Sequence, residues 1–209
     1  MAGEIHLKTR IDDILNSYFY KNIRSIIIML LIYTSGIFFG VIQYRLNVEL
    51  ISQNIFNNFN DYFKIVSEGG LAFKDALLTL MADGFWFLSA AFICSFVFIG
   101  ILPIAGLMFY KGMTVGYGMC CAIAIYRMYG NSLLIWQIAL WNIAVAPFFI
   151  LFCSDCSIFS VGIFKTLVKN QVSFRLKKEI LLLFNKYLIN LAISAVLALI
   201  TVLFTIVIH

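Results

Sequence analysis

Long apolar segments separated by short charged ones recur along the whole chain. Between Gly84 and Ser154 only two residues are charged, Lys111 and Arg127. About 20 apolar residues cross the ~30 Å hydrocarbon layer of a bilayer, so this stretch is long enough for several crossings. A charge at the centre of a membrane helix costs about 2.5–3.5 kcal/mol. We therefore expect an integral membrane protein in which these two cations mark water-facing helix ends.

The apolar pattern predicts an all-α bundle of five transmembrane helices. The expected limits are Ser25–Tyr44 for the first, a start at Gly84 for the second, an end near Tyr126 for the third, Leu133–Ser154 for the fourth and Tyr187–Ile208 for the fifth. The turn between the second and third spans stays open between two positions. It lies at Lys111, or it lies within Gly100–Gly106 and leaves Lys111 inside the third span, reaching the cytoplasmic surface. Pro103 favours the second position.

The distribution of charge predicts the orientation of the bundle. Most of the fifteen Lys and Arg residues fall on one side if the N-terminus is cytoplasmic and the C-terminus lies outside, as the positive-inside rule requires. Residues 1–24 are then a cytoplasmic lead-in, and residues 25–209 form one bundle domain. Within this domain we expect an outer loop over 46–83 and a basic cytoplasmic loop over 155–186.

Two segments outside the expected spans show helical periodicity. The N-terminal one is formed by Ile11, Ile14, Leu15, Tyr18 and Phe19. The outer loop carries two apolar stripes separated by Gly69-Gly70, with Ile55, Phe59, Phe63 and Val66 in one and Phe73, Leu77, Leu80 and Met81 in the other. We expect amphipathic helices at the membrane surface in both segments. A docking surface for an extracytoplasmic protein is the alternative for the loop, with Phe59, Tyr62, Phe63, Lys64 and Phe73 as candidates.

Composition agrees with a membrane protein. The chain of 209 residues is 63% hydrophobic and 12% charged, with a mean hydropathy of +0.98. Soluble chains carry about 25% charged residues. The net charge of +5 is explained by the proposed orientation and requires no nucleic-acid partner.

The expected spans offer little chemistry. They contain no Asp, Glu or His, which proton-coupled carriers and intramembrane hydrolases need at depth. Cys153-x-x-Cys156 has the spacing of a metal or redox site, but no second Cys or His pair accompanies it, and Cys120-Cys121 is expected near mid-membrane. We therefore predict no catalytic residue, no cofactor and no metal, and interpret the cysteines as packing residues.

Small and polar residues within the spans suggest helix contacts. Gly112-x-x-x-Gly116 has the spacing that allows two membrane helices to approach closely. This contact is either internal or part of a homo-oligomer, and the sequence leaves both open. Asn142 is interpreted as an interhelical hydrogen-bonding residue, and Pro147 as a candidate kink.

The segment Gly100-x-x-Pro103-(x5)-Phe109-Tyr110-Lys111-Gly112-(x3)-Gly116 resembles the signature region of the stage II sporulation protein M family. Asn142-(x4)-Pro147 in the following span resembles it as well. Members usually have a proline and a polar residue just before the Asn, where this chain has Leu140 and Trp141. Size, five crossings and the outer loop also fit, so the resemblance covers essentially the whole chain.

The resemblance implies a multi-pass protein of the mother-cell membrane at the sporulation septum. It implies a role in engulfment of the forespore, by anchoring or recruiting the peptidoglycan-degrading stage II sporulation proteins D and P. On this basis we expect a non-enzymatic membrane scaffold. The alternative is a small membrane transporter or channel with Lys111 near the substrate path.

Overall fold

The computed structural model of the chain describes residues 2–46, 73–97, 99–129, 133–169 and 176–208. They form five α-helices, which are α1 (Ala2–Leu46), α3 (Phe73–Ser95), α4 (Ile101–Tyr129), α5 (Leu133–Lys169) and α6 (Leu176–Ile208). Apart from the short turn between α3 and α4, every described residue is helical. The prediction of an all-α fold is confirmed.

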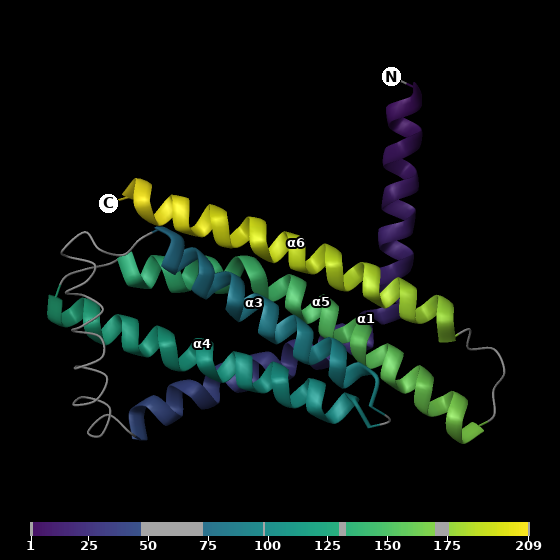
Figure 1. The fold of residues 1–209 in the computed structure, drawn as a ribbon, viewed down its shortest axis with the longest axis horizontal. Helices are drawn as coiled ribbons and strands as arrows, with labels where there is room; N and C mark the ends of the chain where they lie inside the picture. The colour runs from purple at the N-terminus through teal and green to yellow at the C-terminus, as the bar shows by residue number, and fades with distance from the viewer. Residues whose placement is uncertain (1, 47–72, 98, 130–132, 170–175, 209) are drawn as a thin grey trace.

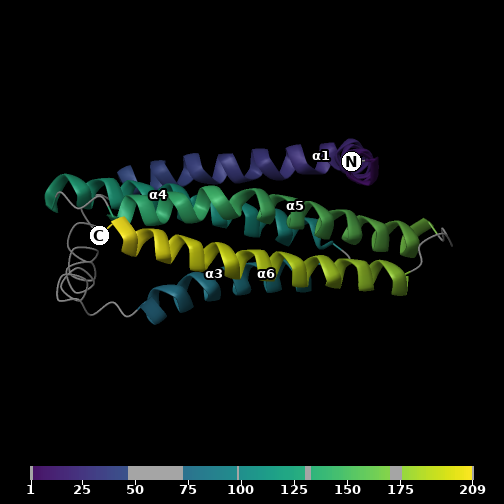
Figure 2. The same cartoon turned by 90° about the horizontal axis from the view of Figure 1, so that it is seen from above.

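The helices run alongside one another in alternating directions (Figure 1). α1, α4 and α6 finish at one end of the bundle, and α3 and α5 begin at that same end. Figure 2 shows α4 and α5 between α1 on one side and α3 with α6 on the other. In the described part of the chain, accordingly, α1 packs on α4 and α5, and α3 packs on α4, α5 and α6.

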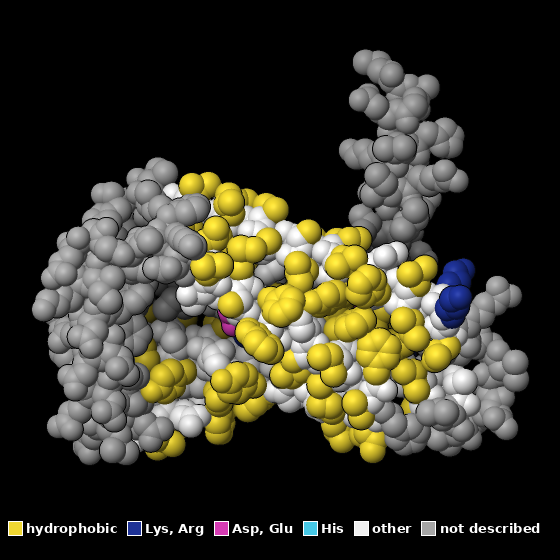
Figure 3. Space-filling model, viewed as in Figure 1, with side chains coloured by type: hydrophobic (Ala, Val, Ile, Leu, Met, Phe, Trp, Pro, Cys, Tyr) yellow, Lys and Arg dark blue, Asp and Glu magenta, His cyan; other side chains and the backbone are white. Residues whose placement is uncertain are grey.

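Four of these helices contain a stretch that is long and apolar enough to cross a membrane, namely Asn22–Leu46, Leu77–Ser95, Ala139–Thr166 and Leu176–Phe204. Hydrophobic side chains cover much of the outer surface (Figure 3). Such long helices with apolar outer faces are typical of a protein embedded in a membrane. In the described part of α4 no such stretch was found, and Lys111 with several glycines and tyrosines interrupts its apolar residues.

α1 is one continuous helix of 45 residues, whereas the sequence predicted a separate lead-in before Ser25. No proline or glycine stands between Glu4 and Ser35, so nothing in this stretch interrupts the helical hydrogen bonds. The N-terminal part of α1 projects away from the bundle (Figure 1). The side chains of the predicted amphipathic face, residues 11–19, lie outside the description.

α3 merges two elements that the sequence treated separately. The expected amphipathic stripe from Phe73 to Met81 and the expected second span from Gly84 belong to one helix. Gly84 does not interrupt it, because the residue is buried where α3 meets Ser194 of α6. α3 thus overlaps the expected outer loop over residues 73–83.

The turn between the second and third expected spans lies between Ser95 and Ile101, so it adjoins the predicted position within Gly100–Gly106 and not the alternative at Lys111. α3 ends at Ser95 and α4 begins at Ile101, so Lys111 lies inside α4. Gly100 closes this turn, since a Cβ there would collide with the carbonyl oxygen of Cys94. The Gly100 carbonyl accepts a hydrogen bond of 3.1 Å from the backbone N–H of Ile104, which opens α4.

α5 and α6 are longer than the predicted spans, and they take up most of the expected cytoplasmic loop over 155–186. α5 continues past Asp155 to Lys169, and α6 already begins at Leu176. Asp155 does not end the helix because its carboxylate is bonded to Lys186 of α6 at 2.9 Å. Only residues 170–175 separate the two helices.

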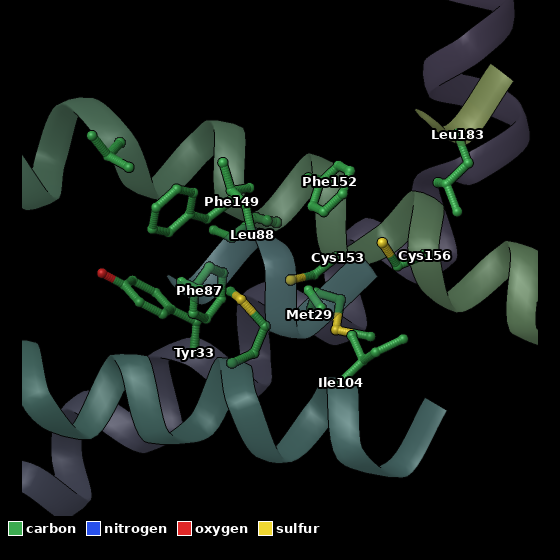
Figure 4. Packing of buried hydrophobic residues seen from close by; sticks show 14 of the residues in the cluster. Met29, Tyr33, Phe87, Leu88, Ile104, Phe149, Phe152, Cys153, Cys156 and Leu183 are labelled. Atoms are coloured by element: carbon green, nitrogen blue, oxygen red, sulfur yellow. The ribbon is translucent and has the colours of Figure 1, made fainter. Parts of the chain in front are cut away.

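All five helices contribute to one hydrophobic core. Fully buried side chains from successive helices are Met29, Leu88, Met108, Phe152 and Ala198. At its centre the rings of Phe87 on α3 and Phe149 on α5 stack with their centroids 4.5 Å apart (Figure 4). Interdigitating aromatic and aliphatic side chains thus hold α3, α4 and α5 at a fixed distance.

Candidate functional site

Lys111 of α4 and Asp83 of α3 form an ion pair within the bundle. The Lys111 ammonium donates a hydrogen bond to Asp83 Oδ2. The Lys111 side chain is 11% exposed and the Asp83 side chain 42% exposed. The prediction that Lys111 marks a water-facing helix end is therefore wrong. The sequence also placed Asp83 in the outer loop, whereas it lies inside the apolar stretch Leu77–Ser95.

α5 completes the surroundings of this pair. The indole Nε1–H of Trp141 donates a hydrogen bond of 3.2 Å to the same Asp83 oxygen. The Lys111 ammonium lies 5.7 Å from the centroid of the Phe149 ring, within the range of a cation–π interaction. Asp83 Oδ2 thus accepts from two donors on two helices, and the pair links α3, α4 and α5.

A second ion pair joins Asp155 of α5 to Lys186 of α6 at 2.9 Å. Both residues lie inside stretches apolar enough to cross a membrane, Ala139–Thr166 and Leu176–Phe204. The expectation that the spans contain no acidic residue is therefore wrong at two positions, Asp83 and Asp155. At both, a lysine on a neighbouring helix supplies the compensating charge, which lowers the cost of burial.

Gly112 and Gly116 lie against α1. A Cβ on Gly112 would collide with the carbonyl oxygen of Tyr33, and one on Gly116 with that of Ile37. The contact is reciprocal, because a Cβ on Gly36 or on Gly40 of α1 would collide with backbone carbonyl oxygens of α4. The two Gly-x-x-x-Gly segments therefore interlock between parallel helices. The open choice between internal packing and a homo-oligomer is decided for internal packing at this contact.

The other motif residues on α4 also occupy defined places. Pro103 lies in the first turn of α4, where the missing N–H of proline leaves no helical hydrogen bond unmade. The Phe109 ring packs on Phe39 of α1 with the centroids 5.6 Å apart. Together with Gly100 in the turn, these residues fix where α4 starts and how it meets α1.

Asn142 directly follows Trp141 on α5, and Pro147 lies more than one turn beyond it. Asn142 is half-buried, and Pro147 is exposed within the helix. Pro147 cannot donate to the carbonyl of Ile143 four residues earlier, so the helix lacks one hydrogen bond there. Trp141, which differs from the family pattern, is the residue of this region that bonds to Asp83.

Cys153 and Cys156 do not lie at a span end, as the sequence had suggested. Both are fully buried in the middle of α5, and their side chains project into the hydrophobic core (Figure 4). Among the described residues, no three His, Cys, Asp or Glu side chains gather closely enough to hold a metal ion. The two thiols are thus part of the hydrophobic core, as small apolar side chains would be.

Most of the candidate docking residues cannot be placed. Phe59, Tyr62, Phe63 and Lys64 fall within residues 47–72, outside the described residues. Phe73 is the first residue of α3, and its side chain is likewise outside the description. The docking surface therefore stays a prediction.

Sequence reasoning missed three parts of this site. Gly36-x-x-x-Gly40 in the first span was the available signal for the partner of the α4 glycines. Asp83 and Lys111 each stood next to an apolar stretch, and their opposite charges at comparable distances from the α3–α4 turn were the signal for their pairing. For Trp141 no sequence signal was available.

The residues that suggested a resemblance to the stage II sporulation protein M family lie in the turn before α4, on α4 and on α5. Four of them make internal contacts of the bundle, namely Gly100 in the turn, Lys111 in the ion pair, and Gly112 and Gly116 in the contact with α1. In comparisons with known proteins, no protein-family model, no curated protein and no solved structure matches the chain.

Proposed function

We propose that the protein is a membrane bundle with five crossings, in which α4 is the crossing helix that hydropathy alone does not identify. α3 ends at one end of the bundle and α5 begins at the other, and α4 joins them (Figure 1). Since α3 and α5 each hold a stretch long enough to cross, the helix between them has to cross as well. The bond from Lys111 to Asp83 lowers the cost of the charge in α4.

The charges of α1 support a position for the bilayer. Arg24 and Arg45 bound the apolar part of α1 and lie about 31 Å apart along a helix, close to the ~30 Å hydrocarbon thickness. Gly112 contacts Tyr33, which lies about 14 Å from Arg24 and about 18 Å from Arg45 on the same scale. In this proposal the Lys111 ion pair lies near the middle of the hydrocarbon.

We place the N-terminus in the cytoplasm and the C-terminus outside. α1, α4 and α6 then run outward, while α3 and α5 run inward. Basic side chains near the junction of α5 and α6 fall on the cytoplasmic side in this orientation, as the positive-inside rule requires, and they include Lys165, Lys177 and Lys178.

Within this framework we propose a non-catalytic membrane scaffold of endospore formation. It anchors or recruits peptidoglycan-degrading proteins, stage II sporulation proteins D and P, at the septal membrane of the mother cell. The observation that carries the proposal is that Lys111, Gly112 and Gly116, which suggested the family resemblance, make internal contacts of α4 with α1 and α3. These residues hold the bundle together, and they leave the segment between α1 and α3 as the part that meets the partner.

A crosslinked pull-down from sporulating cells that express the tagged full-length protein tests this function. We expect enrichment of peptidoglycan-degrading proteins over other envelope proteins. Replacing residues 47–72 with a Gly/Ser linker of equal length should abolish the enrichment. Gly106→Ala, whose added Cβ meets nothing within 4 Å, is the control and should keep it. A pull-down from the unaltered protein without any peptidoglycan-degrading protein would contradict the proposal.

The ion pair itself favours a second candidate, a small transporter. The Asp83 carboxylate is 42% exposed although it lies within an apolar stretch, and the positive charge of Lys111 lies beside it. An ionisable residue at depth in a membrane is by default a candidate for a transport site. Lys111→Met separates the candidates: a transporter loses flux in liposomes with this change, whereas the scaffold keeps its pull-down partners if the bundle still folds.

A further inference from the structure

A groove lies between α1 and α5 near the end of the bundle where α4 begins. Its volume is about 430 Å³. Ile28 and Met29 line one wall, Ile158 and Val161 line the other, and Ile101 of α4 also contributes. The walls are thus mainly aliphatic. Such a lining suits a hydrocarbon chain.

Two serines also line this groove, but their hydroxyl protons are directed into the helices. Ser157 Oγ donates to the carbonyl oxygen of Cys153 at 2.8 Å, and Ser25 Oγ donates to that of Ser154 at 3.5 Å. Neither hydroxyl therefore offers its proton to a ligand. The inner part of the groove can accept apolar atoms without leaving a donor unpaired.

One lysine lines the groove, and an arginine lies next to it on α1. Lys165 of α5 lines it, is exposed, and stands next to the end of the apolar stretch at Thr166. Arg24, also exposed, directly precedes the groove residue Ser25 on α1. The acidic residue of α5, Asp155, is bonded to Lys186 of α6.

The dimensions suit a lipid that stays in its leaflet. From Lys165 to Ser157 the helix rises about 12 Å, close to the ~15 Å that half of the hydrocarbon layer measures. A phosphate at the level of Lys165 would place an acyl chain along the apolar walls. Basic pockets between membrane helices on the cytoplasmic side are known sites for anionic headgroups.

We propose that this groove binds one anionic phospholipid, with an acyl chain between α1 and α5 and the phosphate beside Lys165. The site depends on membrane embedding and is independent of the proposed scaffold function. The full-length protein, purified in a neutral detergent, is titrated with phosphatidylglycerol or phosphatidylcholine and analysed by native mass spectrometry. We expect one phosphatidylglycerol to bind preferentially.

Three variants test the two halves of the site. Lys165→Gln should weaken phosphatidylglycerol binding about fivefold. Ile158→Trp, which fills the groove and leaves the charges intact, should weaken it as well. Lys177→Gln is the matched control, because Lys177 is an exposed lysine at the start of α6 outside the groove, and it should bind as the unaltered protein does. Thermal unfolding of each variant verifies that the bundle is intact.

Three outcomes would overturn the proposal. Equal losses in Lys165→Gln and Lys177→Gln would mean general attraction between charges. Equal binding of phosphatidylcholine would mean that the headgroup charge is not recognised. Competition by inorganic phosphate at the same concentration as the lipid would mean a free-anion site in which the acyl chain takes no part.

Discussion

Lys111 on α4 and Asp83 on α3 lie 28 positions apart in the chain and form an ion pair within the bundle. The charge pattern had assigned them to opposite sides of the membrane. Their pairing removes the reason for placing either one in water, because each compensates the charge of the other. It also ties α4, in whose described part no apolar stretch long enough to cross was found, to two helices that are apolar enough to cross a bilayer.

The ion pair should be visible as an energetic coupling. Lys111→Met leaves the Asp83 carboxylate without its cation, and Asp83→Asn leaves the ammonium without its anion. Each single change should lower the free energy of unfolding in detergent. The loss in the double variant should be smaller than the sum of the two single losses. We expect a coupling of about 0.5–3 kcal/mol in a double-mutant cycle. Strictly additive effects would show that the two residues do not interact.

Trp141→Phe tests the hydrogen bond to Asp83 separately from the packing of the aromatic ring. The change keeps most of the buried ring and removes the indole N–H, which donates at 3.2 Å. We expect a loss of about 1.5–3 kcal/mol, as for other hydrogen bonds to a charged group. In an Asp83→Asn background the same change should cost less. An equal cost in both backgrounds would assign the effect to packing alone.

The glycine contact between α1 and α4 predicts opposite effects for two alanine substitutions in the same helix. Gly112→Ala places a methyl group against the backbone of Tyr33, so α1 and α4 must separate, and overpacking typically costs about 1–3 kcal/mol. Gly106→Ala adds its methyl group in open space and should be neutral or stabilising, since alanine favours a helix. Thermal unfolding of both variants compares them directly. Equal stabilities would contradict the interlocked arrangement.

Burial of the cysteines predicts their labelling. Cys153 and Cys156 are fully buried, whereas Cys94 and Cys120 are partly exposed. In the folded protein in detergent, a maleimide should leave Cys153 and Cys156 unmodified, and all five cysteines should react after denaturation. Peptide mass spectrometry identifies the modified positions. Fast labelling of Cys153 or Cys156 in the folded protein would show that α5 is not packed as described.

The sequence predicted the all-helical fold because long apolar segments leave few other structures available in a membrane. The sequence placed the apolar part of α1 well, because the observed stretch Asn22–Leu46 nearly equals the expected Ser25–Tyr44. It failed where charges were taken as boundaries. Asp155 was expected to end a helix, but an ion pair with Lys186 allows α5 to continue.

The candidate site was predictable only in part. The spacing of Gly112 and Gly116 indicated a close helix contact, although its partner on α1 could not be read from one helix alone. The role of Lys111 depends on Asp83, and pairing across helices is a property of the packed bundle. Local periodicity identifies which face of a helix is apolar, but it does not identify the residue opposite a given position.

The position of α4 in the bilayer tests the account most directly. Single spin labels are placed at Leu102, Tyr110 and Arg127, all exposed on α4, in a cysteine-free variant reconstituted into liposomes. Collision rates with oxygen and with a water-soluble nickel complex measure the depth of each label. We predict that Tyr110, adjacent to Lys111, is the deepest of the three, shielded from nickel and rich in oxygen collisions. A label at Tyr110 as accessible to nickel as one at Arg127 would contradict a crossing α4 with an ion pair at its centre.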